Sequence, residues 1–127
     1  MTIGELVGGS VISVRPAQTL SQAAQTMVSL EVGSVAVMVD GALEGILTER
    51  DLLGALARGV DCDEELVSSW MSPLPETFHP DQSVMEAANW MLATDYRHLP
   101  VLDDDGAVLG IVSIKDVLWA TTDIEVG

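Results

Sequence analysis

The chain has 127 residues, 48% of them hydrophobic, which is enough for a real core in one compact domain or two small halves. Twenty acidic residues against five basic ones give a net charge of −15. This field repels polyanions, so we expect no nucleic-acid partner. No apolar run approaches the roughly 18 to 20 residues that cross a bilayer, and the first residues lack the pattern of a signal peptide, so we expect a cytoplasmic protein without a membrane partner.

Much of the sequence occurs twice. Residues 16–24 match residues 80–88 at a constant offset of 64, and residues 45–53 match residues 110–118 at an offset of 65. The one inserted residue falls in a hairpin turn, whose length can change without disturbing its strands. We therefore predict two repeats, residues 1–60 and 70–127, joined by a linker over residues 61–69.

A short extended segment opens each repeat, at residues 11–14 and 76–78. Each segment ends shortly before a proline, Pro16 or Pro80, and proline disfavours helical backbone in the residue before it. We therefore predict that each repeat begins with a strand.

A helix follows, because Thr19 with Gln22 and Ser83 with Glu86 have the spacing of a capping box. Apolar residues then recur at helical spacing, which predicts a buried stripe. Its predicted members are Leu20, Ala23, Ala24, Met27 and Val28 in the first repeat and Val84, Ala87, Ala88, Met91 and Leu92 in the second.

Two runs rich in Val, Ile and Leu come next in each repeat, separated by Asp40-Gly41 or by residues 103–106. Such runs around an Asp-Gly turn predict a β-hairpin. They cover residues 34–39, 43–47, 99–102 and 108–112.

A last helix closes each repeat, at about residues 49–58 and 114–120, and Gly59 follows the first as a helix-ending glycine would. Before Met71 we predict a short helix within the acidic connecting segment. The fold class is therefore α/β, more specifically α+β, with two β-α-β-β-α repeats.

This order, the duplication, Leu99-Pro100-Val101 and the run from Gly110 to Asp116 together resemble the cystathionine-beta-synthase (CBS) domain family over nearly the whole chain. The resemblance implies a tandem pair, or Bateman module, with pseudo-twofold symmetry, two clefts between the repeats and frequent homodimers. It implies a regulatory sensor that binds AMP, ADP, ATP or S-adenosylmethionine and transmits occupancy to a partner protein, which the sequence does not name.

By the same resemblance, binding depends on the motif Gly-hydrophobic-x-Thr/Ser-x-x-Asp. It occurs twice, as Gly45, Thr48 and Asp51 and as Gly110, Ser113 and Asp116. A carboxylate at a helix start can accept hydrogen bonds from both ribose hydroxyls, while the hydroxyl and the helix amides meet phosphate.

The resemblance also implies which residues surround the adenine. These are Val7, Ile12, Val32 and Gly33 in the first copy and Met71, Glu76, Tyr96 and Arg97 in the second. Arg97 and His98 precede Leu99-Pro100, where similar proteins direct basic side chains toward phosphates. Their counterparts are Gly33 and Ser34, so the two clefts are unequal and we favour the second for a charged nucleotide.

Other interpretations remain open. Each Thr/Ser-x-x-Asp can be a helix cap alone, and a ligand-free dimerisation adaptor is the alternative function. Trp90 and Trp119 lie off the predicted buried stripes, which suggests a homodimer contact, with partial burial inside the monomer as the alternative. The charge favours AMP or cationic S-adenosylmethionine over ATP, which would need magnesium.

Catalysis is disfavoured, because the sequence contains no nucleophile–base pairing, phosphate-binding loop or dinucleotide fingerprint. We therefore expect no enzyme and no catalytic cofactor. His79 and His98 have no His or Cys partner at ligand spacing, so we also expect no metal site.

Overall fold

The computed structural model describes residues 1–7, 11–73 and 76–126. The chain forms two compact units. Unit 1 combines Met1–Val11 with Glu76–Gly127, and unit 2 is Ile12–Pro75. This division differs from the predicted repeat boundaries, because the N-terminal segment packs in the unit of the second repeat and the residues after the linker pack in the unit of the first.

Unit 2 contains a four-stranded sheet in the order β1-β2-β3-β4. Its strands are β1 (Ser13–Val14), β2 (Ser34–Val39), β3 (Ala42–Thr48) and β4 (Ser72–Pro73). β1 is parallel to β2, and the other neighbours are antiparallel. Asp40 and Gly41, between β2 and β3, have φ angles of 50° and 81°. These positive values are what a two-residue hairpin turn requires, so the predicted turn is confirmed.

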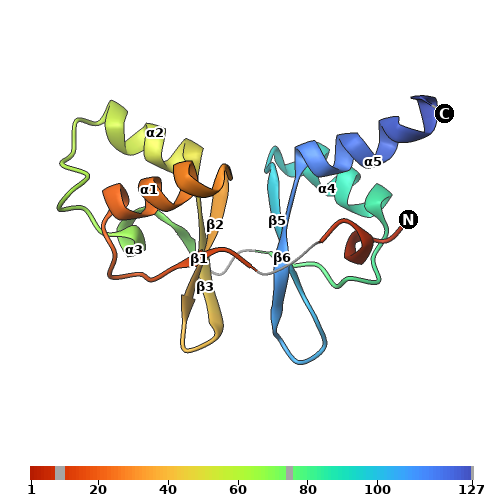
Figure 1. Cartoon of the computed structure of the whole chain (residues 1–127), viewed down its shortest axis with the longest axis horizontal. Coiled ribbons are helices and arrows are strands. Elements are labelled where there is room, and N and C mark those ends of the chain that lie inside the picture. Colours follow the sequence, from red (N-terminus) through yellow and green to blue (C-terminus); the bar gives the residue numbers. More distant parts are fainter. Residues whose placement is uncertain (8–10, 74–75, 127) are drawn as a thin grey trace. The chain divides into compact units, whose positions relative to one another are not determined.

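The helices of unit 2 are α1 (Leu20–Leu30), α2 (Glu49–Ala57) and the short α3 (Val67–Trp70). α1 and α2 lie on the same side of the β2–β3 hairpin (Figure 1). α3 confirms the short helix predicted before Met71. Among the described residues, no helix is long and apolar enough to cross a membrane.

Unit 1 is built around the hairpin of β5 (His98–Leu102) and β6 (Val108–Ser113), with α4 (Val84–Thr94) and α5 (Ile114–Val126). Phe78 forms a parallel bridge with Val101 and so takes the place that β1 has in unit 2. The short helix η1 (Ile3–Glu5) also belongs here. The N–H of Ile3 donates to the carbonyl of Gln82 at 2.8 Å, which ties the N-terminal segment to unit 1.

α1 and α4 begin at the predicted capping boxes. Thr19 Oγ1 accepts from the Gln22 N–H at 3.2 Å, and the Gln22 side chain accepts from the Thr19 N–H at 2.9 Å. Ser83 and Glu86 exchange the same bonds at 3.0 and 3.3 Å. A hydrogen bond from the Gln82 side chain, together with those from Ser83, lowers the pKa of Glu86 below its usual value.

The buried stripe of these two helices is narrower than predicted. Its buried members are Leu20, Ala23 and Met27 in α1 and Val84, Ala87 and Met91 in α4. Val28 and Leu92, which were predicted to complete it, are 77% and 81% exposed. A residue eight positions after the first lies about 80° around the helix from it, beyond the side that faces the sheet. The prediction was wrong for these two positions.

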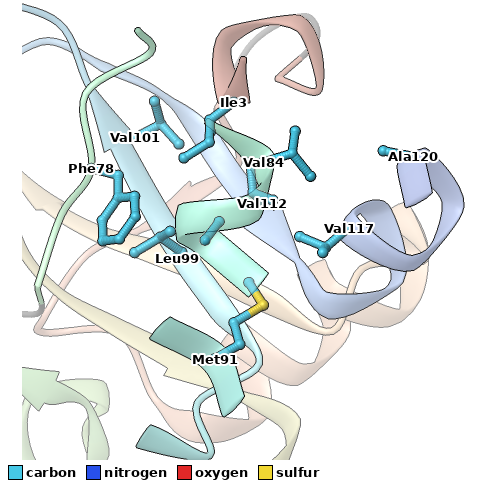
Figure 2. Packing of buried hydrophobic residues seen from close by; sticks show 10 residues of the cluster. Ile3, Phe78, Val84, Met91, Leu99, Val101, Val112, Val117 and Ala120 are labelled. Carbon is cyan, nitrogen blue, oxygen red and sulfur yellow. The ribbon is translucent and has the colours of Figure 1, made fainter. Parts of the chain in front are cut away.

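Each unit has its own hydrophobic core. In unit 1, Leu99, Val101 and Val112 of the hairpin face Met91 of α4 and Val117 of α5 (Figure 2). Ile3 is completely buried in the same cluster although it lies far away in sequence. The N-terminal segment is therefore a structural part of unit 1.

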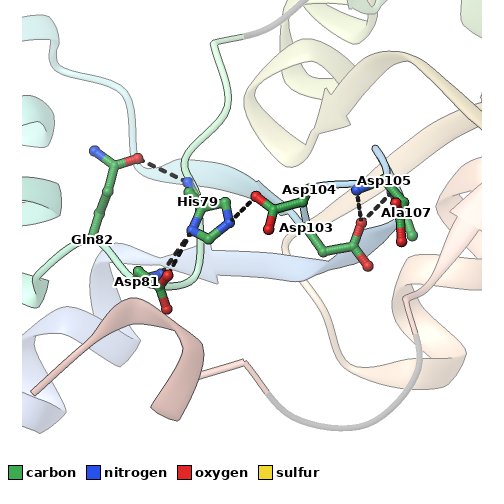
Figure 3. A network of polar contacts seen from close by, with 7 residues as sticks. All are labelled: His79, Asp81, Gln82, Asp103, Asp104, Asp105 and Ala107. Atoms are coloured by element: carbon green, nitrogen blue, oxygen red, sulfur yellow. Dashed lines mark hydrogen bonds and ion pairs between the residues drawn. The ribbon is translucent and has the colours of Figure 1, made fainter.

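A polar network ties the β5–β6 turn to the segment before α4 (Figure 3). His79 Nε2 lies 2.7 Å from Asp104 Oδ1, and His79 Nδ1 accepts the backbone N–H two residues later at 3.2 Å. Within the turn, the Asp103 carboxylate accepts the N–H groups of Asp105 and Ala107, both at 2.9 Å. The longer turn of the second repeat is thus closed by its own side chains.

Candidate functional site

The first motif lies where β3 gives way to α2 in unit 2. Asp51 Oδ2 accepts the Thr48 N–H at 2.9 Å and the Thr48 hydroxyl at 3.1 Å, and Thr48 Oγ1 accepts the Asp51 N–H at 3.3 Å. Both side chains are half-buried. The arrangement caps the helix and fixes the rotamer of the carboxylate.

The second motif has the same geometry at the start of α5 in unit 1. Asp116 Oδ2 accepts the Ser113 N–H at 2.9 Å and the Ser113 hydroxyl at 3.0 Å, and Ser113 Oγ accepts the Asp116 N–H at 3.2 Å. In the described part of the chain, neither Asp51 nor Asp116 uses its other carboxylate oxygen in a hydrogen bond. Each motif therefore holds one aspartate oxygen in the cap and leaves Oδ1 as an acceptor.

The residue pair before each second strand lies beside its motif. The Gly33 carbonyl accepts the N–H of Glu49, the first residue of α2, at 3.0 Å. The Arg97 carbonyl accepts the N–H of Ile114, the first residue of α5, at 2.8 Å. The backbone thus brings Val32 and Gly33, or Tyr96 and Arg97, to the helix start that carries the aspartate.

The hairpin register adds one more residue to each site. Ser34 is paired with Thr48 across β2 and β3, and His98 is paired with Ser113 across β5 and β6. His98 is half-buried, and Arg97 is exposed. The imidazole and guanidinium groups of unit 1 therefore have no basic equivalents at the corresponding positions of unit 2.

The motif glycines mark close approaches of a second segment. A Cβ on Gly45 would lie 2.7 Å from both Met71 Sδ and the Ser72 carbonyl oxygen. A Cβ on Gly110 would lie 2.6 Å from Val7 Cγ1. A Cβ at either position would force its neighbour to shift, so each motif is packed tightly against a residue far away in sequence.

These approaches place two predicted site residues in units other than those of their sequence repeats. Val7 was predicted in the first copy and Met71 in the second, whereas Val7 packs on Gly110 and Met71 packs on Gly45. Each segment enters the other repeat's compact unit, where its backbone finds hydrogen-bond partners. The roles of Val7 and Met71 in binding stay predictions.

The remaining predicted residues lie in the units expected from their sequence positions. Ile12 and Val32 pack against the core of unit 2, and Pro100 is completely buried in β5. Glu76 lies in unit 1, but its carboxylate is engaged, because Glu76 Oε2 accepts the indole N–H of Trp90 at 2.7 Å.

Trp90 was not among the predicted site residues. Its ring centroid lies 5.6 Å from that of Tyr96 and 5.9 Å from that of Phe78. The indole is half-buried within unit 1, as the partial-burial alternative stated, whereas Trp119 is 69% exposed. The position of Trp90 off the apolar stripe indicated a contact outside the main core, but the sequence did not indicate that its partners are Glu76, Phe78 and Tyr96.

The basic groups of unit 1 lie near its motif. Lys115 directly precedes Asp116, and Arg97 is bonded through its carbonyl to the same helix start.

Among residues 1–7, 11–73 and 76–126, no group of three or more His, Cys, Asp or Glu side chains is placed to hold a metal ion.

The two halves of the chain match one protein family. The model of the CBS domain matches residues 3–58 and again residues 67–123. The chain belongs to the CBS-domain family. The tandem of two CBS repeats and the α+β fold class are therefore confirmed.

Comparisons with individual CBS proteins agree with this family assignment. The chain is 36% identical over 121 residues to an uncharacterised protein of Methanopyrus kandleri, covering 93% of this chain and 61% of that protein. It is 31% identical to a CBS-domain-containing protein of Agrobacterium tumefaciens of known structure, with a TM-score of 0.89 over 95% of this chain and 99% of that one. The chain thus spans about three fifths of the Methanopyrus relative.

A third CBS protein was solved with a nucleotide. The crystal structure of CBSX2, a CBS-pair protein from Arabidopsis thaliana, contains AMP. It shares 25% identity with this chain and has a TM-score of 0.82 over 98% of each chain.

Proposed function

We propose that this chain is a regulatory module that binds an adenosine-containing nucleotide at its Thr/Ser-x-x-Asp motifs and transmits the occupancy to a partner protein. The observation that carries the proposal is the unused Oδ1 of Asp51 and of Asp116, each fixed by a bonded Oδ2 at a helix start. An oriented carboxylate that still has an acceptor is suited to the paired hydroxyls of a ribose.

The helix start supplies the second half of a nucleotide site. The positive dipole ends of α2 and α5 favour a phosphate. The AMP in CBSX2 supports the choice of ligand class. We propose AMP or S-adenosylmethionine over ATP, because a net charge of −15 opposes each added phosphate charge.

Unit 1 is the proposed site for the more strongly charged ligand. Arg97 and Lys115 lie close in sequence to its motif, and local cations dominate the long-range field within about 8 Å at physiological salt. His98 is paired with Ser113 of the motif and adds a side chain that can donate a hydrogen bond. ATP would then bind with magnesium to offset its charge. In unit 2 the positions of Arg97 and His98 are taken by Gly33 and Ser34.

We also propose that the chain works as a homodimer. Apolar side chains remain exposed on α2 and α5, namely Leu53, Leu56, Leu118 and Trp119. Exposed large apolar groups on neighbouring turns are typical of protein interfaces. Light scattering should give twice the chain mass, and Trp119→Lys should shift the mass toward that of the monomer. A monomeric unaltered chain would contradict the dimer.

The sensor and the ligand-free adaptor are separated by ligand-dependent stabilisation. A ligand that binds only the folded chain raises the melting temperature with its concentration. The experiment is a thermal-shift series with AMP, ADP, ATP with and without magnesium, NADH and S-adenosylmethionine. The sensor predicts a rise for AMP or S-adenosylmethionine that is smaller in Asp51→Ala and Asp116→Ala. Unchanged melting with every compound would favour the adaptor.

A further inference from the structure

Unit 1 contains an aromatic ladder that ends at Tyr96. The Phe78 and Trp90 rings meet edge to face at an interplanar angle of 62°, and Trp90 and Tyr96 lie at 30° to each other. The Glu76 carboxylate fixes the other side of the indole by accepting its N–H at 2.7 Å. The indole is therefore held by an edge contact, a tilted ring contact and a charge-assisted hydrogen bond.

Tyr96 connects this ladder to the second motif. It stands one residue before Arg97, whose carbonyl is bonded to the first residue of α5. The ring of Tyr96 packs on Trp90 while the residue remains 58% exposed, and its backbone directly precedes the residue that is bonded to the helix start carrying Asp116. Trp90 limits the orientations that this ring can adopt.

Unit 2 has no equivalent ladder. At the offset of 64 residues, the counterparts of the four ladder residues are Ile12, Val14, Thr26 and Val32. None is aromatic or acidic. The difference between the two motifs thus includes the ladder residues as well as Arg97 and His98.

We infer that Glu76 and Trp90 are positioning residues that hold Tyr96 as a stacking surface, so that the unit 1 motif selects ligands with a planar base. The inference rests on the proposed nucleotide function and deepens it. Stacking of a base on an aromatic side chain contributes to affinity without reading hydrogen bonds of the base. Trp90 acts through Tyr96, whereas Asp116 acts on the sugar.

The test is a double-mutant cycle on AMP affinity, measured by calorimetry in the Asp51→Asn chain so that only the unit 1 motif stays intact. Tyr96→Leu should weaken AMP binding roughly tenfold, the scale of one base–aromatic stack. Trp90→Leu should weaken it by a similar factor, and the double variant should lose no more than Tyr96→Leu alone. Thr26→Ala, at the counterpart of Trp90 in unit 2, is the matched control and should bind like the parent chain.

Rescue by conservative variants separates positioning from general destabilisation. Glu76→Gln keeps an oxygen acceptor for the indole N–H and should retain AMP affinity, whereas Glu76→Ala should lose affinity. Tyr96→Phe keeps the ring and should bind like the parent. In a chain whose other tryptophans are replaced by phenylalanine, Trp90 emission should change with AMP and saturate with the calorimetric isotherm.

The outcomes distinguish the positioning role of Glu76 and Trp90 from the proposed nucleotide binding. Two results would overturn the positioning role and leave nucleotide binding intact. The first is additive losses of AMP affinity in the cycle. The second is AMP binding that depends on Asp116 although Trp90→Leu does not change the affinity and AMP does not change the Trp90 emission. Absence of binding of both AMP and S-adenosylmethionine to the unaltered chain would overturn both.

Discussion

The Asp116→Asn variant should separate the structural role of Asp116 from its proposed role in binding. The carboxylate accepts the N–H and the hydroxyl of Ser113 through Oδ2, at 2.9 and 3.0 Å. An asparagine carbonyl oxygen can accept the same two bonds. The amide nitrogen then replaces Oδ1 and cannot accept the ribose hydroxyls. The variant keeps the start of α5 and removes the acceptor.

Asp116→Asn should have a large effect on AMP affinity and a small effect on the free energy of unfolding. A hydrogen bond to a charged group contributes about 1.5 to 3 kcal/mol, so losing both ribose contacts should weaken AMP binding at this motif by about a hundredfold or more. The free energy of unfolding should change by less than about 0.5 kcal/mol in Asp116→Asn, because the cap persists. Asp116→Ala removes the cap as well and should cost about 1 kcal/mol of stability.

The assay combines calorimetric titration with AMP and thermal unfolding of the ligand-free chain. Asp51→Asn tests the first motif in the same way, and Asp105→Asn controls for the change in net charge, because Asp105 is exposed in the β5–β6 turn. Wild-type affinity and wild-type stoichiometry of AMP binding in both Asp51→Asn and Asp116→Asn would refute the reasoning and leave the two aspartates as helix caps only.

Three further predictions concern the units themselves. Gly110→Ala should lower the free energy of unfolding, measured by chemical denaturation, by about 1 to 3 kcal/mol, because the added Cβ would lie 2.6 Å from Val7 Cγ1. In Gly54→Ala the added Cβ has no atom within 4 Å, so the same measurement should give a slightly higher free energy of unfolding. Ile3→Ala should cost about 2 to 5 kcal/mol by the same measurement, because Ile3 is completely buried; an unchanged midpoint would contradict the docking of the N-terminal segment. The lowered pKa of Glu86 means that its contribution to stability is present above the usual glutamate pKa and is lost as the pH falls through the lowered value; carboxyl NMR titration should show the low pKa, and Glu86→Gln should remove this part of the acid dependence.

Local elements were predictable because their signals lie within a few residues of each other. The boxes at Thr19 and Ser83 fixed where α1 and α4 begin, and Asp40-Gly41 fixed the first hairpin. The motif aspartates were identified through the resemblance to the CBS-domain family, and their spacing from Thr48 and Ser113 is also a capping pattern. The side chains at the helix starts could therefore be placed from sequence.

Long-range pairing was not predictable from the same signals. Periodicity shows which face of a segment is apolar, but not which unit it will cover, so the packing of Val7 on Gly110 and of Met71 on Gly45 was not predicted. The bond between Glu76 and Trp90 joins residues 14 positions apart that share no periodic pattern. Trp90 could be recognised only as a residue off the apolar stripe.

The most direct test of nucleotide recognition compares AMP with 2′-deoxy-AMP by calorimetry, in the unaltered chain and in the Asp51→Asn/Asp116→Asn variant. If Oδ1 accepts the ribose hydroxyls, the unaltered chain should prefer AMP by roughly tenfold or more, the scale of one hydrogen bond to a charged group, and the variant should bind both ligands equally weakly. Equal affinity of the unaltered chain for both nucleotides, or a preference for AMP that persists in the variant, would contradict the role of the two aspartates.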